Sequence, residues 1–252
     1  MADCWAKSVG QCSEKMTLEH LVSEGMYPDE VLVVQGLHWC KHESKEVPIK
    51  VLSSRILCDN HNKALSPVDK AGIDAMRKLR EASALHRARV ATGKDQRWTN
   101  ETFTIDGRGL ERWCLKTLIN VAFEDRYKIG KDSEQAGKPS SRLVRIAFGQ
   151  EQFKPKAGLY GVAGIGANWN LVEGFRLIFY VDTEQVLLGS LFSMHGYQFM
   201  LHLEESGIGA NFSIPDLYRG TGYIHAQTMY PPEAIKFQIG KRLSHILKFT
   251  YV

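Results

Sequence analysis

The sequence predicts an α+β protein in two parts, and three observations lead to this prediction. Before about residue 130, apolar residues recur with helical spacing, and all five cysteines lie in this part. After it, short apolar runs alternate with glycine, which is typical of antiparallel strands. Residues 131–141 are polar and contain glycine and proline, so we expect a linker or surface loop there. Residues 1–130 and an antiparallel β-rich segment, 142–252, are therefore the two predicted domains.

Two strands and two helices are predicted in the first part. Residues 31–37 form an apolar run with a glycine near its end, and residues 51–57 form a second extended segment. Ser66 and Pro67 resemble a helix N-cap with proline at the first helical position, and apolar spacing extends this helix to about residue 91. A second helix is predicted after Asp106, with its apolar face formed by Leu110, Trp113, Cys114, Leu118 and Val121.

The second part contains strand candidates separated by short turns. The candidates are residues 143–148, 158–162, 175–181, 186–192, 197–203, 234–239 and 243–251. The short connections at 194–196 and 239–241 suit hairpins, so we expect an antiparallel sheet.

Composition excludes several classes of protein. Of 252 residues, 44% are hydrophobic and 24% charged, which is ordinary for a globular protein. No apolar run approaches the roughly 20 residues that a membrane-spanning helix needs. Residues 1–4 carry neither the basic nor the apolar segment of a signal peptide. An odd number of cysteines favours metal-bound or free thiols over a disulfide framework, so we expect a cytoplasmic protein.

A structural zinc site is predicted from four residues. Three cysteines and one histidine are a common tetrahedral ligand set for Zn²⁺, and the set here is Cys4, Cys12, Cys58 and His61. Two residues separate Cys58 from His61, which lets both side chains converge on one ion. Seven residues separate Cys4 from Cys12, which is a wide gap, and Cys40 is an alternative ligand. The competing interpretation is that these are ordinary buried thiols.

A second group of residues has the chemistry of a hydrolytic centre. Glu19 precedes His20, and a histidine beside a carboxylate can act as a general base at neutral pH. A Glu-His pair of this kind is also common on protein surfaces. Asn62 directly follows the second zinc motif, where its side chain can bind a second, hard cation that neutralises charge on a phosphate.

The order of these motifs resembles the HNH superfamily of endonucleases, in particular an uncharacterised bacterial branch. Two cysteines precede Thr17-Leu18-Glu19-His20, and Cys58-Asp59-Asn60-His61-Asn62 follows. The resemblance implies a ββα-metal site on a treble-clef zinc module and the hydrolysis of phosphodiesters, in DNA before RNA. It also implies His20 as the base, Glu19 as its acidic neighbour, and Asn62 as the ligand of a catalytic Mg²⁺ or Mn²⁺.

Three features of the chain differ from the usual pattern of that family. The first zinc motif is longer, His61 stands where a cysteine is usual, and residues 53–55, Ser-Ser-Arg, occupy the place of the asparagine that orients the base. A zinc module can keep its fold after losing catalysis. The alternative is therefore an inactive zinc module that binds nucleic acid or a protein partner.

Basic residues concentrate between residues 70 and 112. Nucleic-acid backbone is one partner for such a segment, and the candidate contacts are Arg77, Lys78, Arg80, Arg87 and Arg89. A solvated helix face is the alternative interpretation. A protein partner or a second copy of the chain is a further option for residues 142–252.

Overall fold

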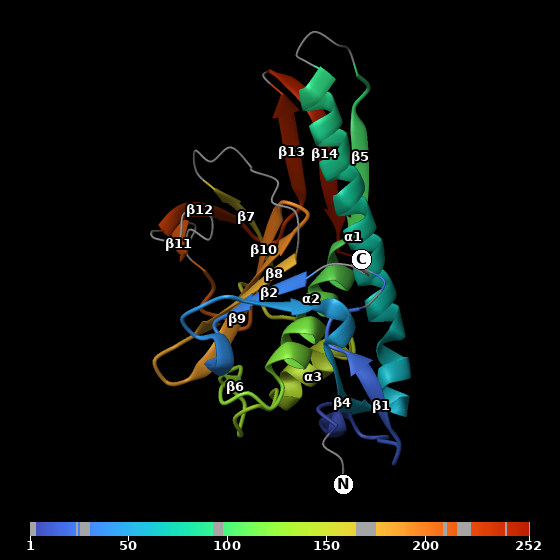
Figure 1. The fold of residues 1–252 in the computed structure, drawn as a ribbon, viewed down its shortest axis with the longest axis vertical. Helices are drawn as coiled ribbons and strands as arrows, with labels where there is room; N and C mark the ends of the chain where they lie inside the picture. The colour runs from blue at the N-terminus through green and yellow to red at the C-terminus, as the bar shows by residue number, and fades with distance from the viewer. Residues whose placement is uncertain are drawn as a thin grey trace.

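The computed structural model describes residues 4–23, 25, 31–92, 98–164, 175–208, 211–215, 223–239 and 241–251. Its helices are α1 (Asp59–Thr92), α2 (Gly107–Ala122), α3 (Ser141–Ala147) and the short 3₁₀ helices η1 (Lys7–Val9), η3 (His38–Cys40) and η4 (Ile49–Val51). Its strands are β1 (Met16–His20), β2 (Val31–Gln35), β3 (Lys45–Pro48), β4 (Ser53–Cys58), β5 (Glu101–Asp106), β6 (Lys128–Ile129), β7 (Gly158–Gly164), β8 (Phe175–Val181), β9 (Val186–Met194), β10 (Tyr197–His202), β11 (Asn211–Pro215), β12 (Tyr223–Met229), β13 (Ala234–Ile239) and β14 (Arg242–Thr250). Helices and strands both form large parts of the molecule, as an α+β protein requires (Figure 1).

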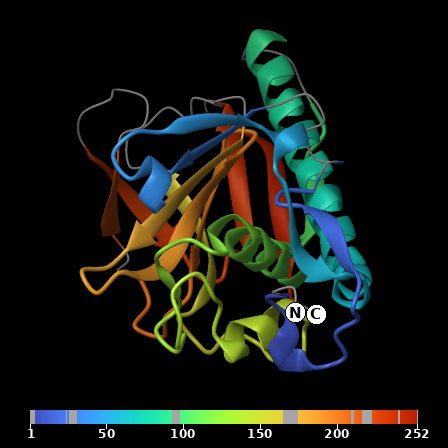
Figure 2. The ribbon, with the colours of Figure 1, turned by 60° about the horizontal axis from the view of Figure 1, so that its bottom comes forward.

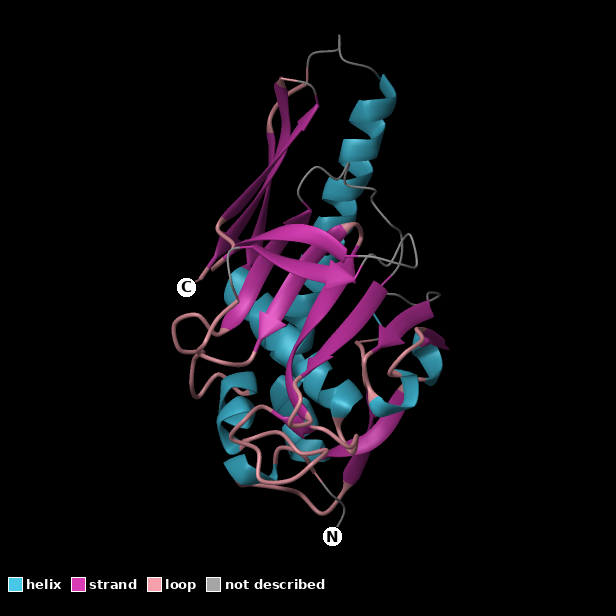
Figure 3. Ribbon diagram, turned by 90° about the vertical axis from the view of Figure 1, so that its left-hand side faces the viewer, coloured by secondary structure: helices cyan, strands magenta, loops and turns pink. Residues whose placement is uncertain are grey.

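Three sheets organise the described strands. The largest has the order β11-β12-β7-β10-β9-β8-β2-β3, with β6 paired to β9. A second sheet, β13-β14-β5, lies along the C-terminal half of α1, and the third is the pair β1-β4 (Figures 1 and 3). Helix α2 lies between the large sheet and α1 (Figure 2). No helix of the described residues combines the length and hydropathy that a bilayer crossing requires.

Strands from the two ends of the chain share sheets. Every strand pair described within residues 142–252 is antiparallel. The parallel pairs β2-β8, β6-β9 and β14-β5 each join a strand from before residue 131 to one from after residue 141. One apolar core runs from Cys4 to Phe249 and includes residues from both predicted domains. The described core is therefore continuous across residues 131–141.

Helix α1 begins earlier than predicted. Its first residue is Asp59, directly after β4, and Pro67 lies inside it rather than at its start. A proline within a helix has no N–H to donate to the carbonyl four residues earlier. Leu65 and Val68, on either side of this proline, are buried in the core, and this packing offsets the missing hydrogen bond.

The strand predicted at residues 143–148 is wrong, because this segment forms helix α3. Ser140 caps the helix, and its Oγ accepts a hydrogen bond from the Leu143 N–H at 3.3 Å. The buried residues Leu143, Ile146 and Ala147 follow the i, i+3, i+4 spacing of a helix. In a segment this short, the same apolar residues are also compatible with a β-strand.

Other predicted elements are confirmed. Strands β8 and β13 have the predicted bounds, and β2 ends one residue before Gly36. Helix α2 begins after Asp106, whose Oδ1 accepts a hydrogen bond from the Gly109 N–H at 2.8 Å. Strands β1 and β5, on either side of α1 in the sequence, were not predicted.

Gly72 of α1 packs tightly against Trp113 of α2. A Cβ atom added there would lie 2.4 Å from Cδ1 and Cγ of the fully buried Trp113. The indole is also fixed at its other edge, because its Nε1–H donates to Ser23 Oγ at 3.2 Å. Only glycine fits this crossing without displacement of the tryptophan.

We therefore expect Gly72→Ala to destabilise the protein by about 1–3 kcal/mol, the cost of overpacking a core. In an ordinary helix interior the same change stabilises by about 0.5–1 kcal/mol, so the sign of the effect is diagnostic. Urea unfolding of the variant measures it. In the double variant Gly72→Ala/Trp113→Phe, the smaller ring should make the combined loss less than the sum of the single losses. Strict additivity would contradict the proposed contact.

Candidate metal centre and active site

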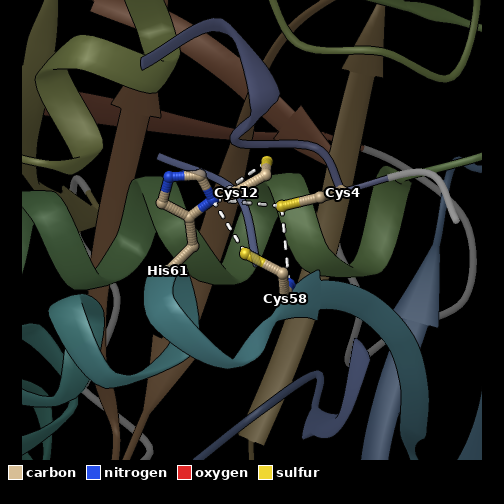
Figure 4. Close-up of side chains that lie close together, drawn as sticks. All are labelled: Cys4, Cys12, Cys58 and His61. Carbon is tan, nitrogen blue, oxygen red and sulfur yellow. Dashed lines mark hydrogen bonds between the residues drawn. The ribbon is translucent and has the colours of Figure 1, made fainter. Parts of the chain in front are cut away.

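Four side chains converge at the junction of β4 and α1. The ligand atoms of Cys4, Cys12, Cys58 and His61 all lie within 4.8 Å of one another (Figure 4). His61 Nδ1 is 3.2 Å from Cys4 Sγ, 3.6 Å from Cys12 Sγ and 3.3 Å from Cys58 Sγ. Tetrahedral zinc with Zn–S near 2.3 Å and Zn–N near 2.0 Å requires ligand separations of about 3.5 Å. The donor set and its spacing therefore fit a structural zinc ion.

Helix η1 explains how Cys4 and Cys12 can reach the same point despite the long gap between them. Residues Lys7–Val9 form this 3₁₀ turn, and Gly10 follows it with φ = 79°. A left-handed conformation of this kind suits glycine. The turn takes up the additional residues and returns the chain, so that Cys12 reaches the same point as Cys4.

The ring of His61 is oriented by a hydrogen bond on its far side. His61 Nε2 lies 2.7 Å from the Gly10 carbonyl oxygen, which can only accept a proton. Nε2 therefore carries the hydrogen, and Nδ1 is left with a lone pair directed at the three sulfur atoms. Such a bond to a backbone carbonyl commonly fixes the tautomer of a metal-binding histidine. The edge of the ring also packs against Phe148, with centroids 5.4 Å apart.

The three thiols differ in how readily they ionise. Burial raises the pKa of Cys4 to about 12 and also raises the pKa of Cys12. At Cys58 burial acts in the same direction, but hydrogen bonds from the backbone N–H groups of His61 and Ser13 outweigh it and lower the pKa to about 7. Zinc binds the thiolate form, so Cys58 is the sulfur best prepared for it.

The remaining cysteines lie apart from this cluster. Cys40 is buried on η3, and Cys114 is buried in α2. Neither belongs to the group of described residues whose ligand atoms converge. The described geometry thus favours the set with Cys4 over the alternative with Cys40.

Strand β1 begins next to the Cys3His cluster and leads away from it to His20. β1 and β4 are antiparallel and pair Met16 with Cys58 and His20 with Ser53. Helix α1 follows β4 without a loop and runs back along β1. In its first turns, Asn62 Nδ2 donates to Thr17 Oγ1 at 3.1 Å, and Thr17 Oγ1 donates to the Leu57 carbonyl at 3.2 Å. Asn62 is thereby held against the strand that ends at His20, and its Oδ1 takes no part in this bond.

Glu19 points into a buried ionic network. Its Oε1 lies 2.6 Å from Lys116 Nζ, and the same ammonium lies 2.6 and 2.7 Å from the two carboxylate oxygens of Asp69. Lys116 is only 2% exposed and Glu19 only 6%. Burial raises the pKa of Glu19, and the charge of Lys116 opposes this rise. The network ties β1 to α1 and α2 directly behind His20.

Helix α1 carries the basic residues predicted to contact nucleic acid. Arg77, Arg80 and Arg87 are exposed, and Lys78 is half-buried. Arg77 and Lys78 share Asp74 as an ion-pair partner, at 2.7 and 2.6 Å. Arg80 and Arg87 are separated by seven residues, or about two helical turns, and so occupy one side of the helix.

Arg89 lies inside the protein. It is 8% exposed, and its guanidinium donates to the carbonyl oxygens of Ser244 and Thr99. It also lies 5.6 Å from the centre of the Trp98 ring. These contacts tie the end of α1 to β14 and to the segment before β5.

Three functionally placed residues were not predicted. Gly10 orients His61, and Asn60 holds the first motif through a hydrogen bond from its Nδ2 to the Gln11 carbonyl at 3.1 Å. Lys116 is the third. It lies within the apolar stretch of α2, and a lysine in such a stretch indicates a buried charge that needs an acidic partner.

Comparisons with protein-family models, with curated proteins and with solved structures find nothing that matches this chain. What the protein does must therefore be inferred from the geometry of its own residues.

Proposed function

We propose that this protein is a metal-dependent nuclease of the HNH type, with a treble-clef zinc module as its scaffold. One observation carries the proposal: β1 pairs with β4, which leads directly into α1, and the Cys3His cluster lies at that junction. Asn62 lies in the first turn of α1 against β1, and His20 ends β1. Apart from the segment that holds β2 and β3 between β1 and β4, this is the order of elements in a ββα-metal site.

In this proposal the zinc set is structural, since its four ligands leave no position for a substrate. His20 takes a proton from the attacking water, within hydrogen-bond reach of the scissile phosphate. Asn62 Oδ1 holds a divalent cation, Mg²⁺ or Mn²⁺, which would supply charge neutralisation at the phosphate. The bond from Asn62 Nδ2 to Thr17 keeps the amide in the orientation that this role needs.

Glu19 acts in this proposal as a positioning residue. Its carboxylate is held by Lys116 at 2.6 Å and is almost fully buried. Fixing this side chain fixes the backbone of β1 at the residue before His20. The basic face of α1 near Arg80 and Arg87 supports a nucleic-acid substrate, because these exposed cations can meet a phosphate backbone. Duplex DNA is the first substrate to test, and RNA is the second.

Two observations favour the rival function, a zinc module that binds nucleic acid without cleaving it. Ser53 stands opposite His20 in the strand pair, near the place where the family has an asparagine that orients the base. In addition, Lys116 neutralises the carboxylate next to His20. Both features differ from the arrangement by which that family supports its general base.

Plasmid nicking in the presence of Mg²⁺ or Mn²⁺ tests the proposal. We expect His20→Ala to reduce the nicking rate by about a hundredfold or more, the usual contribution of a general base. His42→Ala is the matched control, because His42 is exposed and lies outside the candidate site. Both variants must retain their zinc and their melting temperature.

The other outcomes are equally specific. Equal nicking by wild type and His20→Ala would refute His20 as the base. If neither protein cleaves, but both bind DNA with an affinity that falls steeply with salt, the rival is correct. The absence of both cleavage and binding would leave a zinc-stabilised interaction domain.

A further inference from the structure

A polar cavity lies where the start of α2 meets the loop that follows α3. Its volume is about 210 Å³, several times the space that one water molecule needs. Its walls include Arg108, Glu111 and Arg112 from α2, and Gly149, Glu151 and Gln152 from the loop. The zinc ligands and His20 are not among the residues that line it.

The acidic groups of this cavity are already satisfied. Both oxygens of Glu151 are bound, one by Arg142 at 3.1 Å and the other by Arg145 at 3.0 Å. Glu111 Oε2 accepts a hydrogen bond from the Leu159 N–H at 2.9 Å. Burial raises the pKa of Glu111, and the Leu159 N–H and the charge of Arg108 oppose this rise. Glu151 is therefore already paired with two arginines outside the cavity, and Glu111 makes only a long contact with Arg108.

Arg112 forms no ion pair within 4.0 Å among the described residues. Its Nε donates to the Ala147 carbonyl at 3.1 Å, and Asp106 acts on it only as a more distant negative charge. The side chain is half-buried, and this burial lowers the pKa of its guanidinium. The group lies against Gly149, where an added Cβ would come within 2.9 Å of Arg112 Cζ. A side chain at residue 149 would crowd this guanidinium.

Arg108 lies one turn before Arg112 and lines the same cavity. Its only acidic contact in the described structure is a long one, 3.7 Å to Glu111 Oε1, and its other contact is the Tyr251 ring at 5.9 Å. Residues four apart on a helix share a face, so two guanidinium groups reach one small space. Gln152, from the loop after α3, also lines the cavity and carries an amide group.

We propose that this cavity binds a phosphate group. Guanidinium groups present paired N–H donors that match the oxygens of a phosphate, and the two arginines here have donors to spare. The phosphate would belong either to a small molecule such as a nucleotide or to the 5′ end of a nucleic-acid strand. This binding is independent of the proposed cleavage, because no residue of the candidate active site takes part.

Calorimetric titration at constant ionic strength tests the inference. The probes are inorganic phosphate, deoxyadenosine 5′-monophosphate, and one oligonucleotide with and without a 5′-phosphate. We expect wild type to bind phosphate saturably, and both Arg112→Gln and Arg108→Gln to weaken binding by about tenfold or more, as expected for lost charge-assisted hydrogen bonds. Arg126→Gln is the control, because Arg126 is exposed and follows the far end of α2.

The choice of probes distinguishes the two possible sources of the phosphate group. Binding of only the 5′-phosphorylated oligonucleotide would identify a strand end, and equal binding of the free phosphates would identify a small molecule. Saturable binding of none of the probes by wild type would overturn the proposal, as would unchanged binding by the two folded variants. Arg108→Gln keeps the test valid if Arg112→Gln fails to fold, since the Arg108 side chain is 29% exposed and its ion pair with Glu111 is long. His20→Ala should bind phosphate normally, so failure of the nuclease proposal would not affect this result.

Discussion

Serine in place of Cys58 is expected to release the metal and to unfold the region around β1, β4 and the start of α1. Cys58 is fully buried and carries the thiol with the lowest pKa of the three cluster cysteines. Structural zinc contributes about 10–16 kcal/mol of binding free energy in small zinc peptides, as much as the whole stability of an average domain. A loss of even about 5 kcal/mol lowers the melting temperature by roughly 10–20 °C in a chain of this size.

Two measurements check this result. Elemental analysis should find about one zinc ion per chain in wild type and almost none in Cys58→Ser. Thermal unfolding should show the matching loss of stability, and a strong chelator should reproduce it in wild type. Cys40→Ala is the control, because Cys40 is also a buried thiol but lies outside the cluster. If Cys40→Ala loses zinc to the same extent, or if Cys58→Ser keeps it, the assigned ligand set is wrong.

The second large effect is expected from Lys116→Met. Methionine fills a similar volume, but it leaves Glu19 and Asp69 facing each other without a cation in a buried site. Removing one partner of a buried ion pair costs about 3–5 kcal/mol. The triple variant Glu19→Gln/Asp69→Asn/Lys116→Met should recover most of this loss, because no uncompensated charge remains. Urea unfolding measures both proteins, and equal stability of Lys116→Met and wild type would show that the network is not buried as described.

The deficit of Lys116→Met should also depend on pH. Burial raises the pKa of Glu19, and the charge of Lys116 limits that rise, so its removal raises the pKa further. A carboxyl with a higher pKa in the folded state holds its proton more tightly there. Its contribution to stability is therefore complete below the unfolded pKa and is lost as pH rises through the folded pKa. The stability difference from wild type should be smaller at about pH 5 than at about pH 8.

The metal cluster could be predicted from the sequence because its signals are local. Cys58 and His61 lie three residues apart at a strand-to-helix junction, and only two residue types supply soft ligands. The distance between Cys4 and Cys12 argued against the site until the 3₁₀ turn of η1 showed where the intervening residues go. A shared site for His20 and Asn62 could be proposed only from a family resemblance. Their relative positions depend on the pairing of β1 with β4 and on the bond from Asn62 to Thr17, neither of which is visible in the sequence.

Features that depend on distant pairings could not be predicted. β5 carries an alternating pattern too short to recognise, and its partner β14 lies about 140 residues later in the chain. The ion pairs of Lys116 could not be predicted because its two carboxylate partners, residues 19 and 69, lie on other elements. The start of α1 was misplaced because a local preference, proline at a first helical turn, was overridden by packing around Pro67.

The parallel pairs between early and late strands bear on how the chain folds as it is synthesised. The four residues of the Cys3His cluster all precede β5 and β14 in the chain, so the cluster can form before those two strands pair. β5 cannot pair with β14 until residues 242–250 have been added. Pairings this distant form slowly because a long loop must close first. The Cys3His cluster would then form before β14 completes the β13-β14-β5 sheet. A chain cut within residues 131–141 would leave β2 without β8 and β5 without β14, each with an exposed, unpaired edge.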